Sequence, residues 1–268
     1  MASFQCLGPF LTGSPGQSRS VTPGRRSRLL AALVAHVNTV LSIDQVIGEI
    51  WEQDAPAGAA QTVHAHVARL RKDLASHLSG VEARIDWRHP GYVLHTDRAE
   101  VDICVFSDLA GDCAEAWPRN PLRAIESGRQ ALALWRGIPF AGHELGTLGR
   151  ITRARLEETH LATLETVMDA KLELGLHRQL IGELRELVLA HPFYERFHVQ
   201  LMIALYRCQR QSEALDAYHS VRRLLQSELG VEPSPQLRET ATRVLRQDPV
   251  LRAPATSAPV HMMTTWPA

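Results

Sequence analysis

The sequence predicts a mainly α-helical protein with a small β component, in which an N-terminal winged helix-turn-helix precedes an all-α, tetratricopeptide-like domain. Three observations predict this fold. Residues 61–74 have the pattern of an amphipathic helix with a cationic outer face, and two short β-prone runs follow it. The second half of the chain repeats itself at a constant offset of 34 residues.

The first helix is expected to begin at Thr22-Pro23, because threonine is a good N-cap and proline is tolerated in the first turn. Its broad apolar face consists of Leu29, Leu30, Leu33, Val34 and Val37. A second helix follows Ser42-Ile43-Asp44-Gln45, which has the pattern of a capping box. The apolar residues of this helix are Val46, Ile47, Ile50 and Trp51.

The third helix has two different faces. Val63, Val67, Leu70 and Leu74 recur at steps of four, three and four, which predicts a narrow stripe that packs on a core. The opposite face is short, polar and cationic, and it consists of Gln61, Ala65, Ala68 and Lys72, flanked by Thr62, His64, Arg69 and Arg71. Such a face is often only solvated surface, but it also suits a helix that lies in a DNA major groove.

The two β-prone runs, residues 82–87 and 92–95, are joined by Arg88-His89-Pro90-Gly91, which predicts a hairpin with a basic tip. Three helices followed by such a hairpin form a winged helix-turn-helix. The net charge of the chain is zero, so the argument for DNA depends on where Arg69, Arg71, Lys72 and Arg88 are placed.

The second half is expected to be a small helical solenoid. Positions aligned at the 34-residue offset are Gly175, Leu180, Leu184 and Leu187 with Gln209, Ala214, Tyr218 and Val221. Residues 101–116 and 121–135 suggest another helix pair, and residues 147–174 suggest one long helix. Pro192 and Pro233 mark turns between helices. The tail from Pro249 lacks periodicity and is expected to be disordered.

Several separated blocks resemble a known family. The segment TVHAHVARLRKDL with the following basic hairpin resembles the OmpR-type winged-helix domain. The opening FQCLGPF, the block PGRRSRLLAALVAHVNTVLSIDQVIGEIW and the later LALWRG resemble the Streptomyces antibiotic regulatory protein family, in which that domain precedes a bacterial transcriptional activation domain. The resemblance covers roughly residues 4–248 and implies a DNA-binding domain at 1–97, an activation domain at 98–248 and a tail at 249–268.

The expected DNA contacts follow from the helix geometry and from the resemblance. Gln61, Ala65, Ala68 and Arg69 are placed to meet base edges, whereas Thr62, His64, Arg71 and Lys72 are placed to hold phosphates. The resemblance implies that Arg88 enters the minor groove, with His89 and Tyr92 near the DNA backbone. His66 lies closer to the apolar stripe, so a structural role is equally expected for it.

The resemblance also implies an activator of an antibiotic or secondary-metabolite gene cluster. The basic residues are almost all Arg, since only Lys72 and Lys171 are Lys, and this bias suits a GC-rich, actinobacterial source. Two protomers would bind direct repeats in double-stranded promoter DNA near the −35 element and recruit RNA polymerase holoenzyme, including its sigma factor. The implied polymerase-contact loop comprises Glu52, Gln53, Asp54, Ala55 and Pro56 and continues to Gly58. One departure is Ala59-Ala60-Gln61, where family members often carry a basic residue.

Other classes of function are less well supported by the residues. The chain has no phosphate-binding GxxxxGK[ST] loop, no HExxH pattern and no CxxC pair, so neither an enzyme, a metal site nor a cofactor is expected. No apolar run is long enough for a membrane span or a signal peptide, so a cytoplasmic protein is expected. Two alternatives remain open: a scaffold that binds proteins, and a repressor that uses the same winged helix.

Overall fold

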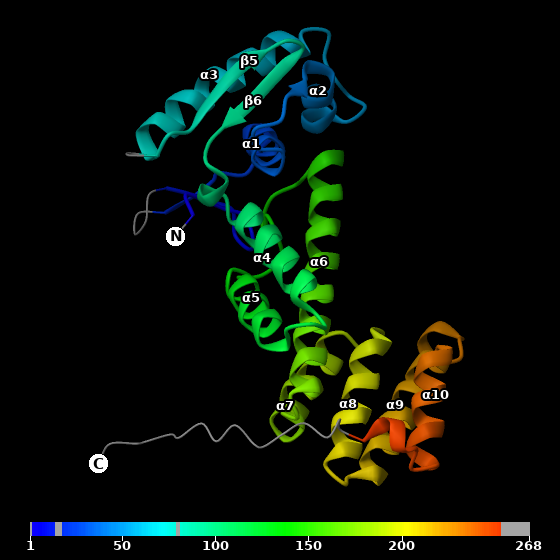
Figure 1. Cartoon of the computed structure of the whole chain (residues 1–268). Helices are drawn as coiled ribbons and strands as arrows, with labels where there is room; N and C mark the ends of the chain where they lie inside the picture. Colours follow the sequence, from blue (N-terminus) through cyan, green and yellow to red (C-terminus); the bar gives the residue numbers. More distant parts are fainter. Residues whose placement is uncertain (1, 14–17, 79–80, 253–268) are drawn as a thin grey trace. The chain divides into compact units, whose positions relative to one another are not determined.

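The structure, a computed structural model, describes residues 2–13, 18–78 and 81–252 (Figure 1). They form two compact units. The first unit contains the described residues up to 115 together with 126–164, and the second contains 116–125 and the described residues from 165 onward. The long helix α6 (Thr147–Glu173) begins in the first unit and ends in the second.

The first unit opens with a small antiparallel sheet of three two-residue strands, β1 (Phe4–Gln5), β2 (Leu11–Thr12) and β3 (Arg19–Ser20), in the order β1-β2-β3. Strands of two residues are too short to show a periodic pattern in the sequence. The sheet is fixed instead by contacts with distant residues: the N–H groups of Cys6 and Leu7 donate to the carboxylate of Asp102.

Helix α1 (Arg25–Ala35) begins later than predicted. Its N-cap is Gly24, not Thr22, so the predicted start at Thr22-Pro23 was wrong. The reason is a reciprocal pair of hydrogen bonds, in which the Gly24 N–H donates to Ser27 Oγ at 3.1 Å and the Ser27 N–H donates to the Gly24 carbonyl at 3.0 Å. The predicted apolar face is buried from Leu29 to Val34, and Val37 lies beyond the end of the helix.

Helices α2 (Ile43–Trp51) and α3 (Ala59–His77) agree more closely with the sequence pattern. The predicted capping box is confirmed, because Ser42 and Gln45 exchange backbone and side-chain hydrogen bonds of 2.9 and 3.2 Å. Helix α3 contains the predicted segment 61–74 and extends it by two residues at the N-terminus and three at the C-terminus.

The predicted hairpin is present as β5 (Arg84–Arg88) and β6 (Gly91–His95). A third strand, β4 (Leu41–Ser42), which the sequence pattern did not indicate, pairs with β6 to give the order β4-β6-β5. Glycine is required at position 91, because a Cβ there would lie 1.8 Å from the carbonyl oxygen of Leu41. The hairpin is therefore tied to the start of α2 as well as to α3.

One hydrophobic core runs through the first unit, from the winged helix into the segment that follows it. It joins side chains such as Leu33 and Val63 to Phe106 and Leu156. In the first unit, this segment comprises a 3₁₀ turn (Arg98–Glu100), α4 (Asp102–Ala116) up to residue 115, α5 (Pro121–Ala133) from residue 126 and the start of α6. The predicted pair at 101–116 and 121–135 and the predicted long helix are confirmed.

The second unit contains α7 (His177–Ala190), α8 (Glu195–Arg207), α9 (Gln211–Leu229) and α10 (Pro235–Leu245), followed by a 3₁₀ turn at Pro249–Leu251. Each helix packs on the next. As predicted, both prolines lie between helices, Pro192 in the turn after α7 and Pro233 in the loop after α9. Helices α7 and α9 begin at His177 and Gln211, which reproduces the 34-residue offset. The first residues of the predicted disordered tail are ordered instead, so that part of the prediction was wrong: the 3₁₀ turn buries Leu251, whose carbonyl accepts a hydrogen bond from Arg207 Nε at 2.9 Å. The rest of the predicted tail, residues 253–268, lies outside the described residues.

None of the helices in the described part of the chain has the length and apolar character needed to cross a membrane. The four cysteines are free thiols, three of them buried.

Candidate nucleic-acid interface

Helix α3 presents one face to the core and the other to solvent. Its apolar stripe, Val63, Val67, Leu70 and Leu74, is buried as the spacing predicts. On the outer face, Thr62 is half-buried, and the remaining predicted contact residues are exposed: Gln61, His64, Ala65, Ala68, Arg69, Arg71 and Lys72. The helix thus exposes a polar surface with two small side chains at its centre, which allows close approach of another molecule.

The cations on this face differ in how they are held. The Arg71 guanidinium donates from Nε to the carbonyl of Ile85 at 2.7 Å, so it ties α3 to the hairpin. Among the described residues, Arg69 and Lys72 form no ion pair. The next residue, Asp73, is paired with Arg26 of α1 at 3.1 Å. Arg69 and Lys72 could therefore meet a phosphate or a base edge without breaking an internal contact.

An aromatic cluster joins α3 to the hairpin. His64 Nδ1 is hydrogen-bonded to the Tyr92 hydroxyl, and the Trp87 ring packs edge-on against both rings, at centroid distances of 5.8 and 5.1 Å. Tyr92 is only 5% exposed, whereas Trp87 is 49% exposed. Burial raises the pKa of the Tyr92 hydroxyl, which keeps it neutral.

The cluster gives different roles to two predicted site residues, Tyr92 and His64. Tyr92 lies behind the surface and orients His64, and Trp87 is the exposed aromatic side chain beside them. Sequence reasoning missed Trp87, although its position at the end of a β-prone run, next to the basic tip, was a usable signal. Arg88 and His89 are exposed at the hairpin tip, as the predicted wing requires.

His66 packs inward, near Trp51 at a centroid distance of 6.4 Å, and both of its ring nitrogens are buried without a hydrogen-bond partner. Burial, with Arg26, Arg69 and Arg25 nearby, lowers the pKa of this imidazole. A neutral ring that packs inward suits a structural role, which is one of the two roles expected for His66.

The segment 52–58 between α2 and α3 is exposed along its whole length. It starts at Glu52, whose φ of 56° is in the left-handed region, and the Asp54 N–H donates to the Trp51 carbonyl at 3.1 Å. The segment therefore turns sharply away from α2 and exposes the predicted polymerase-contact residues, Glu52 to Pro56.

Known proteins share both halves of this arrangement. A family described as "Transcriptional regulatory protein, C terminal" matches residues 17–94, and a family described as "Bacterial transcriptional activator domain" matches residues 101–245. Regulatory protein DnrI of Streptomyces peucetius is 36% identical over 251 residues, which cover 91% of this chain and 92% of DnrI. The chain is a member of the Streptomyces antibiotic regulatory protein family. Its members are transcriptional regulators with a DNA-binding domain, not enzymes.

Other members of the family differ in length. Transcriptional regulator RedD of Streptomyces coelicolor is 34% identical, and the match covers 72% of RedD. Regulatory protein AfsR of Streptomyces griseus is 35% identical, but this chain spans only 25% of it. A solved structure of Mycobacterium tuberculosis EmbR in complex with a low affinity phosphopeptide matches with a TM-score of 0.81 at 29% identity, covering 92% of this chain and 65% of EmbR. The winged helix followed by an all-α domain is thus a shared fold.

Proposed function

We propose that this chain is a sequence-specific activator of a secondary-metabolite gene cluster, which binds direct repeats near a promoter's −35 element as a dimer and recruits RNA polymerase holoenzyme. The observation that carries the DNA-reading part is the outer face of α3. There Arg69 and Lys72 form no ion pair within the described part of the chain, and Ala65 and Ala68 permit close approach. The proposal assigns residues 1–97 to DNA binding, 98–248 to activation and 249–268 to a tail.

In the proposed complex, α3 lies in the major groove. Gln61, Ala65, Ala68 and Arg69 meet base edges, and Thr62, His64 and Lys72 hold phosphates. Arg71 spans the helix and the hairpin, so it contributes charge while fixing the angle between them. Arg88 reaches the minor groove, His89 lies at the DNA backbone, and Tyr92 acts through His64.

The proposed polymerase contact is the exposed segment from Glu52 to Pro56, whose acidic character suits a basic surface of the holoenzyme, such as one on its sigma factor. The segment lies directly between α2 and the proposed DNA-reading helix α3, so it would be carried close to the promoter. This geometry suits recruitment rather than repression.

The first test is a fluorescence-anisotropy titration of labelled promoter fragments from the gene neighbourhood, with wild type and Arg69→Ala/Arg88→Ala, at two salt concentrations. We expect tight, sequence-selective binding by the wild type. In the double variant, loss of a bidentate base contact by Arg69 is expected to weaken promoter binding by about 1–3 kcal/mol. Loss of a phosphate contact lowers the log–log salt slope by about one.

The matched control is Arg119→Ala/Arg123→Ala, which removes the same charge from two exposed arginines, one in the turn between α4 and α5 and one in the first turn of α5. It is expected to bind the promoter as wild type does. Absence of selective binding by the wild type at either salt would contradict the proposal and favour a protein-binding scaffold.

A further inference from the structure

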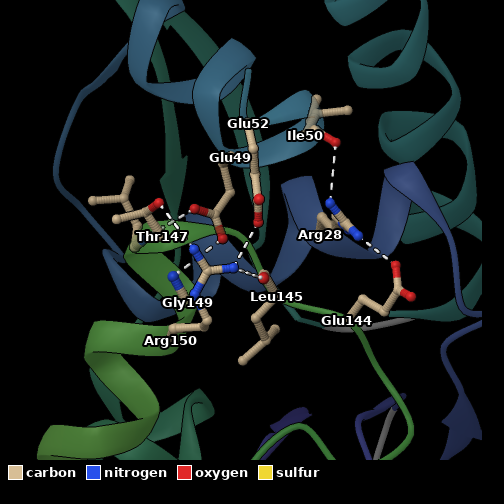
Figure 2. A network of polar contacts seen from close by, with 10 residues as sticks. Arg28, Glu49, Ile50, Glu52, Glu144, Leu145, Thr147, Gly149 and Arg150 are labelled. Atoms are coloured by element: carbon tan, nitrogen blue, oxygen red, sulfur yellow. Dashed lines mark hydrogen bonds and ion pairs between the residues drawn. The ribbon is translucent and has the colours of Figure 1, made fainter. Parts of the chain in front are cut away.

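Helix α2 and the start of α6 are joined by a buried carboxylate. Glu49 is 1% exposed and accepts hydrogen bonds from the N–H groups of Leu148 and Gly149, at 2.8 and 3.1 Å (Figure 2). These two N–H groups belong to the first turn of α6 and have no partner within the helix, so a carboxylate is favoured there by both charge and hydrogen bonding. All three residues lie in the first compact unit.

The approach of the two helices is close enough to require glycine. A Cβ at position 146 would lie 2.3 Å from the carbonyl oxygen of Glu49 and 2.5 Å from its side-chain Cδ. There is no room for a side chain between residue 146 and the end of α2, which leaves little freedom for α2 to shift against the start of α6. The last turn of α2 is therefore fixed by a residue about one hundred positions later in the chain.

A second contact reaches the exposed segment itself. Arg150 Nη1 donates to Glu52 Oε1 at 2.6 Å and to the Leu145 carbonyl at 3.0 Å, and Nη2 donates to the Thr147 hydroxyl at 3.3 Å (Figure 2). The contacts with Leu145 and Thr147, at the start of α6, therefore orient the guanidinium toward Glu52. These hydrogen bonds and the positive charge of Arg150 lower the pKa of the Glu52 carboxyl, so Glu52 is ionised at neutral pH.

Arg28 of α1 makes a parallel connection from the other side. It donates to the Ile50 carbonyl at 3.3 Å and is ion-paired with Glu144, which precedes α6 (Figure 2). The end of α2 is therefore held on two sides, directly by the first turn of α6 and through Arg28 by Glu144, which precedes it.

We propose that Arg150 is a positioning residue for activation: it holds Glu52, and so fixes the base of the segment 52–58, which leaves Asp54 as the carboxylate of that segment that meets the polymerase. Glu52 is thereby reassigned from direct contact to internal support. The inference rests on the proposed function, because it concerns how the same segment reaches its partner.

The structural part is tested on the full-length protein alone, by hydrogen–deuterium exchange of peptides that cover residues 52–58. Arg150→Ala is expected to speed exchange in this segment by about threefold or more, since the segment loses its anchor. The matched control, Arg129→Ala, breaks an exposed pair with Glu126 on α5 and is expected to leave the segment unchanged. Equal exchange in wild type and Arg150→Ala would overturn the inference.

The functional part uses promoter binding and in vitro transcription with purified holoenzyme. Arg150→Ala and Asp54→Asn are each expected to lower transcription by about threefold to tenfold while promoter affinity stays within about twofold. Only Arg150→Ala should change exchange in the segment. Faster exchange with unchanged transcription in Arg150→Ala would overturn the inference.

A charge exchange separates support from direct contact. Glu52→Arg and Arg150→Glu are expected to impair transcription singly, and the double variant is expected to recover most of it, because the ion pair re-forms with its charges reversed. If the double variant regains protection from exchange but not transcription, Glu52 itself contacts the polymerase and the inference is wrong. Failure of the wild type to bind or activate would count against the proposed function instead.

Discussion

At the scale of single residues, Glu49 shows why a buried charge is tolerated. Its two oxygens accept one backbone N–H each at the start of α6, where the helix dipole also favours a negative charge. We expect Glu49→Gln to lower the free energy of unfolding by about 1.5–3 kcal/mol, because the amide turns a donor toward one of these N–H groups and the charge-assisted bonds are lost. Urea denaturation followed by circular dichroism measures this change.

Glu144→Gln is the control for this substitution, since Glu144 is an exposed carboxylate in the same region. Its denaturation midpoint is expected to stay close to that of the wild type. Similar midpoints for Glu49→Gln and Glu144→Gln would show that the buried bonds contribute little.

At the scale of elements, the 34-residue repeat is reproduced bond by bond in two turns. The Leu176 N–H donates to the Lys171 carbonyl at 3.1 Å, and the Arg210 N–H donates to the Leu205 carbonyl at 2.9 Å. The residues before these donors, Gly175 and Gln209, have positive φ angles of 78° and 62°. Both turns are helix C-caps of the Schellman type, which favour glycine at the left-handed position.

The two positions predict opposite effects of exchanging their residues. Gln209→Gly is expected to raise the free energy of unfolding by about 0.5–1 kcal/mol, because the left-handed strain at glutamine is relieved. Gly175→Gln is expected to lower it by about 1 kcal/mol for the same reason. Thermal unfolding of the two variants beside the wild type checks the signs. Destabilisation by both substitutions would mean that side-chain contacts outweigh the backbone preference.

Elements with a regular local pattern were the ones that could be predicted. The stripe from Val63 to Leu74, the capping box at Ser42 and the helix repeat are all encoded within short stretches, and each is present. The two-residue strands and the joint of Glu49 with Leu148 could not be predicted, because they depend on partners far away in the sequence. The start of α1 was misplaced because Gly24 and Ser27 form a cap that competes with the Thr22-Pro23 pattern.

In the candidate site, too, features encoded locally could be predicted from the sequence and features that depend on distant partners could not. Exposure of Arg69, Lys72 and Arg88 follows from periodicity and from the basic hairpin tip. The burial of Tyr92 against His64, the exposure of Trp87 and the pairing of Glu52 with Arg150 arise only when separate elements meet. Residues that orient others were therefore harder to identify than residues that face solvent.

At the scale of the whole molecule, buried imidazoles make stability depend on pH. Burial lowers the pKa of four imidazoles below their ordinary value of 6.5, because a charged ring is poorly solvated inside the protein. These are His66, His143, His177 and His198. The unfolded chain then binds protons at a higher pH than the folded chain does. Stability is therefore complete above about pH 6.5 and falls as the pH drops from there toward the folded pKa values.

We expect the urea midpoint of the wild type to be lower at pH 5.5 than at pH 7.5, and His198→Gln to lose less over the same interval. His198 is suited to this test because burial lowers its pKa despite opposing contributions from the Pro192 carbonyl, which its Nε2 contacts at 2.9 Å, and from Glu195. The substitution itself can shift both midpoints, so the quantity compared is the difference between the two pH values. An equal difference in both proteins would show that His198 takes up its proton as readily in the folded chain as in the unfolded one.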